Sequence, residues 1–270
     1  MVLRALITAL AVALLGGCVS LPPGADFPKS PSTALEDPAK TRLGAAIAIA
    51  GRAHPGKSGF RLFPSGLDGF LVRMQMADAA TATLDVQYYI YHQDETSKLL
   101  SGALLRAAER GVRVRVLLDD HGAVHKSLVL ALDAHPKIEV RLFNPFAYRG
   151  ENSYLRYIEL VVSAPRLKYR MHNKLMVADN TIALVGGRNV GNEYFQAKPE
   201  FEFGDYDLLA AGPIARELSH SFDDYWNDAL AIPVAAFENL EGDEKVLNDL
   251  RTALRIHRQN MQGTDYLDKL

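Results

Sequence analysis

Residues 84–120 read LDVQYYIYHQDETSKLLSGALLRAAERGVRVRVLLDD. Two parts of this run, Leu84–Tyr91 and Val112–Leu118, alternate their side chains with a period of two, which predicts two strands. Between them, apolar residues recur at helical spacing, and Asp94 or Thr96 is available as the N-cap. A strand, a helix and a strand in succession imply a crossover connection with parallel pairing, as in α/β proteins.

Further elements are predicted after this unit. A short helix over Ser127–Ala134 precedes a strand over Ile138–Phe143. Two apolar runs flank Asp179-Asn180, which predicts an antiparallel hairpin with a tight turn. The sheet is therefore expected to be mixed. The remaining predicted elements are the hairpin strands Tyr169–Val177 and Thr181–Val185, a strand over Tyr206–Ala211, and helices over Ile214–Leu230 and Glu241–His257.

The amino terminus has the pattern of an export signal. The apolar run Ala5–Leu15 is too short to cross a bilayer, which takes roughly 20 residues. Leu15-Gly16-Gly17-Cys18 resembles the lipobox of bacterial lipoproteins, which implies a signal peptide over residues 1–17 and lipidation of Cys18. An ordinary signal peptide is the alternative. The proline-rich residues 18–42 are expected to form an extended, lipid-anchored tether. The expected location is a bacterial membrane facing the periplasm, with the outer membrane favoured.

The composition excludes several classes of protein. The 270 residues include 30 Lys and Arg against 32 Asp and Glu, which gives a net charge of -2, and 48% are hydrophobic. This charge balance argues against a nucleic-acid coat, and the composition excludes a polytopic membrane protein and a mostly disordered chain. Cys18 is the single cysteine, so an intramolecular disulfide and a cysteine-rich zinc site are both excluded.

One cluster of residues has the chemistry of a phosphate-binding site. His172 and Lys174 are two apart on a predicted strand, so their side chains are expected on the same face. The next strand leads into Gly186 and Gly187, whose backbone N–H groups are expected to approach an anion closely. Asn189 adds a side-chain amide. Histidine serves as nucleophile or acid–base catalyst, while lysine and asparagine stabilise charge on phosphoryl oxygens, and this set requires no metal and no cofactor.

The spacing of these residues resembles the HKD signature of the phospholipase D superfamily. The matching pattern is His172-x-Lys174-x4-Asp179-x6-Gly186-Gly187-x-Asn189. The resemblance spans roughly residues 45–230, and the run over 186–195 is most similar to the bacterial cardiolipin synthase C-like proteins. It implies an α-β-α sandwich with a mixed sheet flanked by helices.

The resemblance also implies a role for each residue of the pattern. His172 would attack the phosphorus of a phosphodiester and form a phosphohistidine. Lys174 and Asn189 would hold the nonbridging oxygens. Asp179 is expected to have a structural role at the hairpin turn, and Asp205 is expected to orient a catalytic histidine. Many relatives carry serine where this chain has Gly187, so backbone alone replaces a hydroxyl there.

The chain departs from the family in having one such motif, whereas the family's active site uses two. Residues 43–230 are expected to form the phospholipase D-like domain, and residues 231–270 a helical connector towards a missing second half. Either two copies pair as a homodimer, or a separately encoded half supplies the second motif. A truncated, inactive chain is the third alternative.

The cations ahead of the motif have two interpretations. Arg166, Lys168 and Arg170 share parity with His172, so a continuous strand would make them a basic stripe for phosphate capture. A solvated edge face is the alternative.

Aromatic residues and the other histidines are interpreted structurally. Tyr88, Tyr89 and Tyr91 are expected in the core, with an acyl or headgroup cleft as the alternative. His121, His125 and His135 are expected to be surface or core residues, and Trp226 to anchor its helix in the core.

These features favour a phosphatidyltransferase or phospholipase D acting on membrane phospholipids, with cardiolipin as an expected product. Its expected partners are phospholipid, a membrane surface and a second half or copy. The alternatives are an exported single-motif phosphodiesterase or endonuclease acting as a homodimer, and an inactive lipid-binding lipoprotein. Nucleic acid is not expected as a substrate because the chain is not basic.

Overall fold

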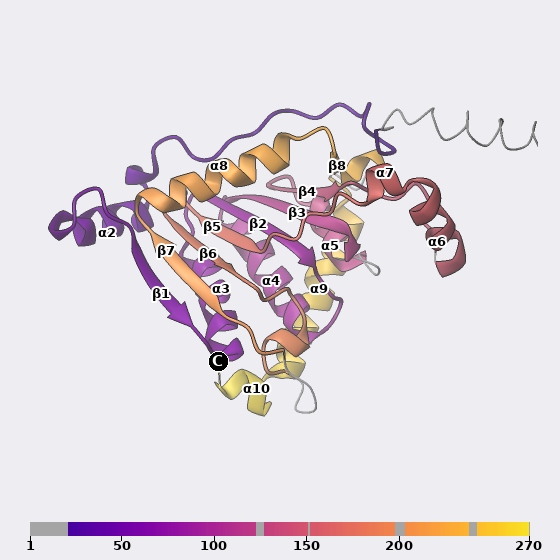
Figure 1. Ribbon diagram of the computed structural model, residues 1–270. Coiled ribbons are helices and arrows are strands. Elements are labelled where there is room, and N and C mark those ends of the chain that lie inside the picture. The colour runs from indigo at the N-terminus through magenta and orange to yellow at the C-terminus, as the bar shows by residue number, and fades with distance from the viewer. Residues whose placement is uncertain (1–20, 123–126, 151, 198–202, 238–241, 270) are drawn as a thin grey trace, which may run out of the picture.

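The computed structural model describes residues 21–122, 127–150, 152–197, 203–237 and 242–269. In these residues a mixed eight-stranded sheet, in the order β1-β7-β6-β5-β2-β3-β4-β8, is flanked by helices (Figure 1). The expected α-β-α sandwich is confirmed. The strands are β1 (Gly59–Phe63), β2 (Thr83–Ile90), β3 (Arg113–Gly122), β4 (Ile138–Phe143), β5 (Leu175–Ala178), β6 (Ile182–Gly186), β7 (Asp207–Ala211) and β8 (Ala231–Pro233). The helices are α2 (Arg42–Ala50), α3 (Gly66–Ala79), α4 (Glu95–Glu109), α5 (Ser127–Ala131), α6 (Ser153–Val162), α7 (Ala164–Leu167), α8 (Pro213–Asn227), α9 (Glu244–Met261) and α10 (Asp265–Lys269).

The predicted strand–helix–strand unit is confirmed. β2 pairs in parallel with β3, and β3 with β4, so the crossover through α4 places three parallel strands side by side. Asp94 is the N-cap of α4: its carboxylate accepts from the Ser97 N–H, while the Ser97 hydroxyl accepts from the Asp94 N–H. This reciprocal capping box satisfies backbone donors that a helix start leaves free.

The hairpin is confirmed, but its first strand is shorter than predicted. β5 and β6 pair antiparallel around Asp179 and Asn180, which adopt positive φ angles of 52° and 49°. β5 begins at Leu175, and the preceding residues form α7 and an extended segment. The strand predicted from Tyr169 is therefore wrong over its first six residues. Arg170 pairs with Asp119, and the Met171 N–H donates to the same carboxylate, so contacts with a side chain replace strand pairing in this segment.

The predicted basic stripe is also wrong, because its members do not share a strand. Arg166 lies in α7, where it is buried and donates to the Asn144 side chain at 2.6 Å. Arg170 forms an ion pair with Asp119 at 3.1 Å. Both guanidinium groups are therefore engaged inside the protein, and Lys168 is left exposed between them.

Two apolar cores hold the layers together. The larger core packs β2, β3 and β4 against α3, α4 and α9. The smaller core lies under α8 on the opposite face, where Trp226 stacks on Phe222 and is fully buried. Burial of Trp226 confirms its expected role as a helix anchor.

Both ends of the described chain contact the domain. The segment before α2, within the predicted tether, runs across α8 (Figure 1), and the Ala34 N–H donates to the Asp223 carboxylate at 2.7 Å. Residues around Ser32 therefore lie against the domain instead of extending freely. At the other end, β8 pairs with β4, and α9 buries Leu247, Leu250 and Leu254, so the fold continues past residue 230.

The sequence patterns missed β1, α2, α3, α6, α7, β8 and α10. β1 has little alternation of burial, since four of its five residues are exposed at the sheet edge.

His135 is buried and accepts from the Lys137 N–H, which fits its structural interpretation. Cys18 and His125 lie outside the described residues. Within the described ranges, none of the helices combines the length and apolarity that a membrane crossing requires.

Candidate functional site

The two basic residues of the motif lie in the extended segment Met171–Lys174, between α7 and β5. Asp119, in the carboxyl-terminal half of β3, holds this segment. One of its carboxylate oxygens accepts from the Met171 N–H at 2.8 Å, and the other pairs with Arg170 at 3.1 Å. Burial raises the pKa of Asp119, while Arg170 acts to lower it. The motif is thus fixed against the carboxyl end of the parallel strands.

His172 and Lys174 both contact the ring of Tyr89. The imidazole and phenol ring centroids are 4.8 Å apart, and the Lys174 ammonium lies 5.5 Å from the Tyr89 ring centroid. Lys174 also donates to the His172 carbonyl at 2.7 Å. His172 is exposed whereas Lys174 is 7% exposed. The segment therefore presents an accessible imidazole next to a largely covered ammonium.

The ammonium of Lys174 has an altered acidity. Burial lowers the pKa of Lys174 below its ordinary value, and the Asp205 carboxylate acts in the opposite direction. A less hydrated ammonium interacts more strongly with an incoming phosphate oxygen, because less water screens the charge. The arrangement suits stabilisation of negative charge close to the imidazole.

Tyr89 lies beside the motif residues, which agrees with the alternative interpretation of the tyrosines and not with the favoured core position, and His121 lies next to it. The Tyr89 and His121 rings stack with centroids 6.3 Å apart, and burial is the main cause lowering the pKa of His121. Tyr88 and Tyr91, in contrast, are core residues as expected. The alternation of β2 already indicated this position for Tyr89, because Tyr89 and Gln87 lie on the same face of the strand. In the structure, the Gln87 amide contacts Met171 of the motif segment.

The glycine pair has a different role from the predicted one. The Gly187 N–H donates to the Tyr206 carbonyl at 3.1 Å, so the expectation that this N–H faces an anion is wrong. A Cβ atom at Gly187 would lie 2.0 Å from both carboxylate oxygens of Asp205, and one at Gly186 would lie 2.3 Å from Asp207. The glycines therefore admit two carboxylates to positions that any side chain would block.

Asp205 is held beside Gly187 and Lys174. Its carboxylate accepts from the Tyr206 N–H at 2.8 Å, and its backbone carbonyl accepts from the buried Arg188. Arg188 in turn pairs with Asp207 at 3.2 Å, and Asp207 also pairs with Arg73 at 2.8 Å. This buried charge cluster positions Asp205 beside Gly187, where its carboxylate also acts on the Lys174 ammonium.

Asn189 connects the glycine loop to the end of β2. Its Oδ1 accepts from the Ile90 N–H at 3.1 Å, and its Nδ2 donates to the Tyr194 hydroxyl at 2.9 Å. The NH₂ group has two hydrogens, and within the described part of the chain one of them has no acceptor. The structure thus shows a positioning contact for Asn189 next to Tyr89.

Asp179 lies apart from the basic pair, at the hairpin turn. Its carboxylate is buried and accepts from the backbone of Thr81, Ala82 and Thr83 and from the Thr81 hydroxyl, at 2.8–3.2 Å. These donors belong to the start of β2. Asp179 therefore ties the β5–β6 turn to β2, which agrees with its expected structural role.

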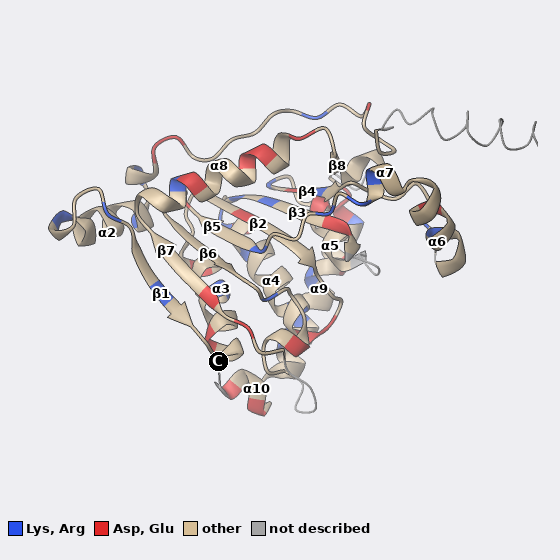
Figure 2. Ribbon diagram, in the orientation of Figure 1, with Lys and Arg blue, Asp and Glu red and all other residues tan. Residues whose placement is uncertain are grey.

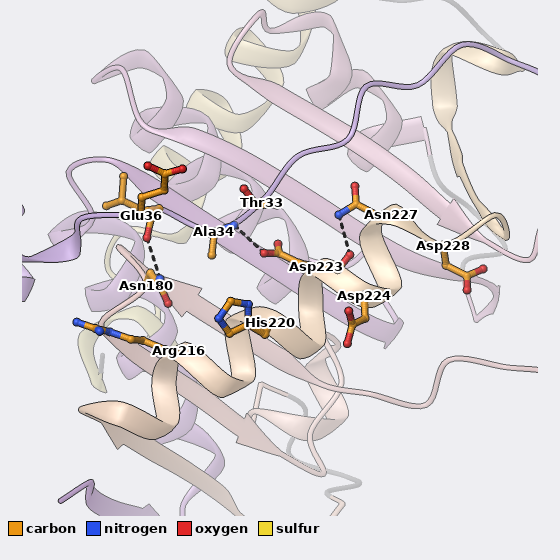
Figure 3. A pocket seen from close by; sticks show the side chains of 11 residues that line it. Thr33, Ala34, Glu36, Asn180, Arg216, His220, Asp223, Asp224, Asn227 and Asp228 are labelled. Carbon is orange, nitrogen blue, oxygen red and sulfur yellow. Dashed lines mark hydrogen bonds between the residues drawn. The ribbon is translucent and has the colours of Figure 1, made fainter. Parts of the chain in front are cut away.

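A cavity of about 700 Å³ lies elsewhere, between α8 and the segment before α2 (Figure 3). Asp223 accepts there from Ala34, and Asn180 donates to the Leu35 carbonyl. Its described lining includes none of the predicted site residues.

A second group has donor atoms suited to a metal ion. Atoms of His92, Asp94 and Glu193 lie within 4.8 Å of one another. They already have partners, since Asp94 caps α4 and His92 pairs with Glu193 at 3.1 Å.

The family model described as "Cardiolipin synthase, PLD-like domain" matches residues 74–226. Cardiolipin synthase C of Escherichia coli is 45% identical over 186 residues, which cover 68% of this chain and 38% of that protein. An uncharacterized protein of Helicobacter pylori is 35% identical over 251 residues, which cover 93% of this chain and 49% of that protein.

The chain thus spans about half the length of these relatives, or less. Among solved structures, the phospholipase D family member Nuc from Salmonella typhimurium aligns at 16% identity with a TM-score of 0.45, covering 66% of this chain and 97% of that one. Since the family model covers more than half of the 270 residues, the chain belongs to the phospholipase D-like family described as cardiolipin synthase, PLD-like domain.

Proposed function

We propose that this chain contributes one catalytic motif to a phosphatidyltransferase or phospholipase D-type enzyme that acts on membrane phospholipids and makes cardiolipin. The observation that carries the proposal is the convergence of an accessible His172 and a largely covered Lys174 on Tyr89, in a member of this family. The similarity to cardiolipin synthase C supports the choice of product.

The proposed reaction begins with an imidazole nitrogen of His172 attacking the phosphorus of a phospholipid. The new P–N bond forms as the P–O bond to the headgroup alcohol breaks, and the alkoxide leaves with a proton from a second acid. Lys174 neutralises a nonbridging oxygen in this step. In the second step, the conjugate base of that acid takes the proton of an acceptor hydroxyl while its oxygen attacks the phosphorus. The new P–O bond forms as the P–N bond breaks, which restores the free imidazole and the acid.

The second acid is proposed to come from another copy of this motif, in a homodimer or in a separately encoded half. The Asp205 carboxylate favours the charged form of Lys174, because a nearby negative charge raises the pKa of an ammonium. We also propose that the chain is exported and anchored through lipid on Cys18. Labelling with radioactive palmitate would contradict the anchor if Cys18→Ala took up as much label as wild type.

The test compares the lipids of cells that express wild type, His172→Ala or His220→Ala. His220 is an exposed histidine on α8 and serves as the matched control. Loss of a nucleophile is expected to lower turnover by roughly 10³-fold or more. Cardiolipin should therefore rise with wild type and with His220→Ala, and stay at the background level with His172→Ala.

An unchanged cardiolipin and phosphatidic acid profile with wild type would contradict the proposal. Release of nucleotides from DNA by the purified chain, dependent on His172, would favour the nuclease alternative instead. Trapping a phosphatidyl group on His172, seen as a mass increase on the peptide that carries it, would establish the covalent step directly.

A further inference from the structure

Helix α6 carries its apolar side chains on the outside of the protein. Six of its residues are between 41% and 75% exposed: Tyr154, Leu155, Tyr157, Ile158, Val161 and Val162. Their spacing of one, three and four residues places them on one side of the helix. Tyr169, just after α7, adds a 54% exposed ring. These seven residues are called the α6 face below.

The polar side of the same helix faces the protein. Glu159 accepts from the backbone N–H groups of Ala147 and Tyr148 at 2.6 and 2.8 Å. Arg156 packs its guanidinium over the Phe146 ring at 4.3 Å and donates to the Asp120 carbonyl. These contacts fix the rotation of the helix, so the outward apolar side is part of the fold.

The chemistry of the α6 face suits a membrane interface. Tyrosine side chains have an apolar ring and a polar hydroxyl, and they are enriched where lipid headgroups meet hydrocarbon. Leucine, isoleucine and valine supply the apolar area, and the exposed Lys168 supplies positive charge beside it. The basic positions that Figure 2 shows on α6 and α7 are Arg156 and Arg166, whose guanidinium groups contact the protein. An exposed apolar helix face with a lysine beside it suits the headgroup region of an anionic membrane.

The position of α6 gives an independent reason for a membrane. Tyr169 is three residues before His172, so the α6 face adjoins the candidate site. The start of the described chain lies at the same end of the molecule (Figure 1). Gly24 packs closely against Ala236, since a Cβ at Gly24 would lie 2.9 Å from the Ala236 side chain. The neighbouring Phe237 ring packs under Arg149, which shortly precedes α6. Gly24 is six positions after Cys18, the predicted site of lipid attachment, so the two can lie at most about 20 Å apart.

We propose that the α6 face docks into the headgroup region of an anionic phospholipid membrane and brings the His172 site to its substrate. This inference rests on the proposed function in taking a phospholipid surface as the partner. A second copy of the chain is a poorer match, because a stable protein interface uses roughly 20–30 residues a side and the α6 face has seven.

The test places a fluorescent probe on the α6 face. Cys18 is the only cysteine, so Cys18→Ala gives a background in which one new cysteine can be labelled. Val162→Cys puts a nitrobenzoxadiazole probe on the α6 face, and Ile256→Cys puts it on an exposed position of α9, as the control. The full chain is then mixed with phosphatidylglycerol vesicles or with phosphatidylcholine vesicles.

With phosphatidylglycerol vesicles, the probe at 162 should shift its emission to the blue and become roughly tenfold less accessible to aqueous iodide, as expected for insertion at the interface. The probe at 256 should not change, and phosphatidylcholine should give a smaller effect at 162. Adding Ile158→Glu to the labelled Val162→Cys chain should abolish the shift.

Two results would overturn the inference. One is a probe at 162 that stays in water with every vesicle. The other is a blue shift without vesicles that grows with protein concentration, which would mean that another copy covers the α6 face. The readout does not need turnover. A chain that docks yet makes no cardiolipin overturns only the proposed function, and a chain that makes cardiolipin while the probe stays in water overturns only this inference.

Discussion

Helices α9 and α6 have the same kind of sequence pattern but opposite surroundings. In α9, the apolar stripe of Leu247, Leu250 and Leu254 is buried against the larger core, and the charged residues face water. In α6, the apolar stripe faces water and the polar side contacts the protein. Amphipathic periodicity therefore predicts a stripe, but it does not say whether the protein's own core or something outside it covers that stripe.

The largest effect that tests this contrast is expected in α9. Leu250 is 4% exposed, so Leu250→Ala removes buried atoms and leaves a cavity. The free energy of unfolding should fall by about 2–5 kcal/mol. Urea denaturation followed by circular dichroism measures it. A change as small as that of an exposed leucine would show that α9 is only loosely attached.

The next effect concerns the inward polar side of α6. Glu159→Ala removes the acceptor for the Ala147 and Tyr148 N–H groups and the partner of Arg166. Unfolding free energy should fall by about 1–3 kcal/mol, because these donors lose their partner. Glu159→Gln keeps one oxygen acceptor and should lose less. If both variants matched wild type in denaturation, the helix would have no fixed orientation.

A smaller effect is expected for a surface charge on α9. Arg251 pairs with Glu109 of α4 at 2.8 Å, but both side chains are 38% exposed. Arg251→Ala should therefore lower the unfolding free energy by only about 0.2–1 kcal/mol, and less in high salt. A loss equal to that of Leu250→Ala would mean that charge, not the leucine stripe, holds α9 in place.

The smallest effect is expected on the outside of α6. Leu155 is 43% exposed, so Leu155→Ala should change the unfolding free energy by less than about 0.5 kcal/mol in the absence of lipid. It is the matched partner of Leu250→Ala. Destabilisation of the purified chain by several times that amount, with a concentration-dependent midpoint, would indicate that another protein surface already covers the helix.

The parts of the fold that were predictable are those set by local pattern. The period of β2, the cap of α4 at Asp94 and the turn at Asp179 are all decided within a few residues, and each agrees with the structure. The strand from Tyr169 failed because Arg166 and Arg170 bind Asn144 and Asp119, which are more than 20 residues away in the chain. These distant partners determine the local conformation, and the spacing of apolar and polar residues within the segment does not predict them.

The candidate site divides in the same way. His172 and Lys174 were identifiable from spacing, but their contact Tyr89 comes from a different strand, and its alternation favoured the core over the alternative of a cleft. The use of the glycine pair was misjudged because the N–H of Gly187 is already bonded to the Tyr206 carbonyl. The space beside Gly187 is occupied by the carboxylate of Asp205, which is 18 residues later and outside the motif, so the motif alone could not predict it.

The close approach of Asp205 to Gly187 limits how this region can change. A Cβ at position 187 would lie 2.0 Å from each carboxylate oxygen of Asp205, which is a clash. Gly187→Ser alone therefore forces the Asp205 side chain to move. In the double variant with Asp205→Gly, this clash does not occur. Each position thus restricts what its counterpart can become. A serine at position 187 therefore requires that the side chain at position 205 be shortened or moved before or together with that replacement.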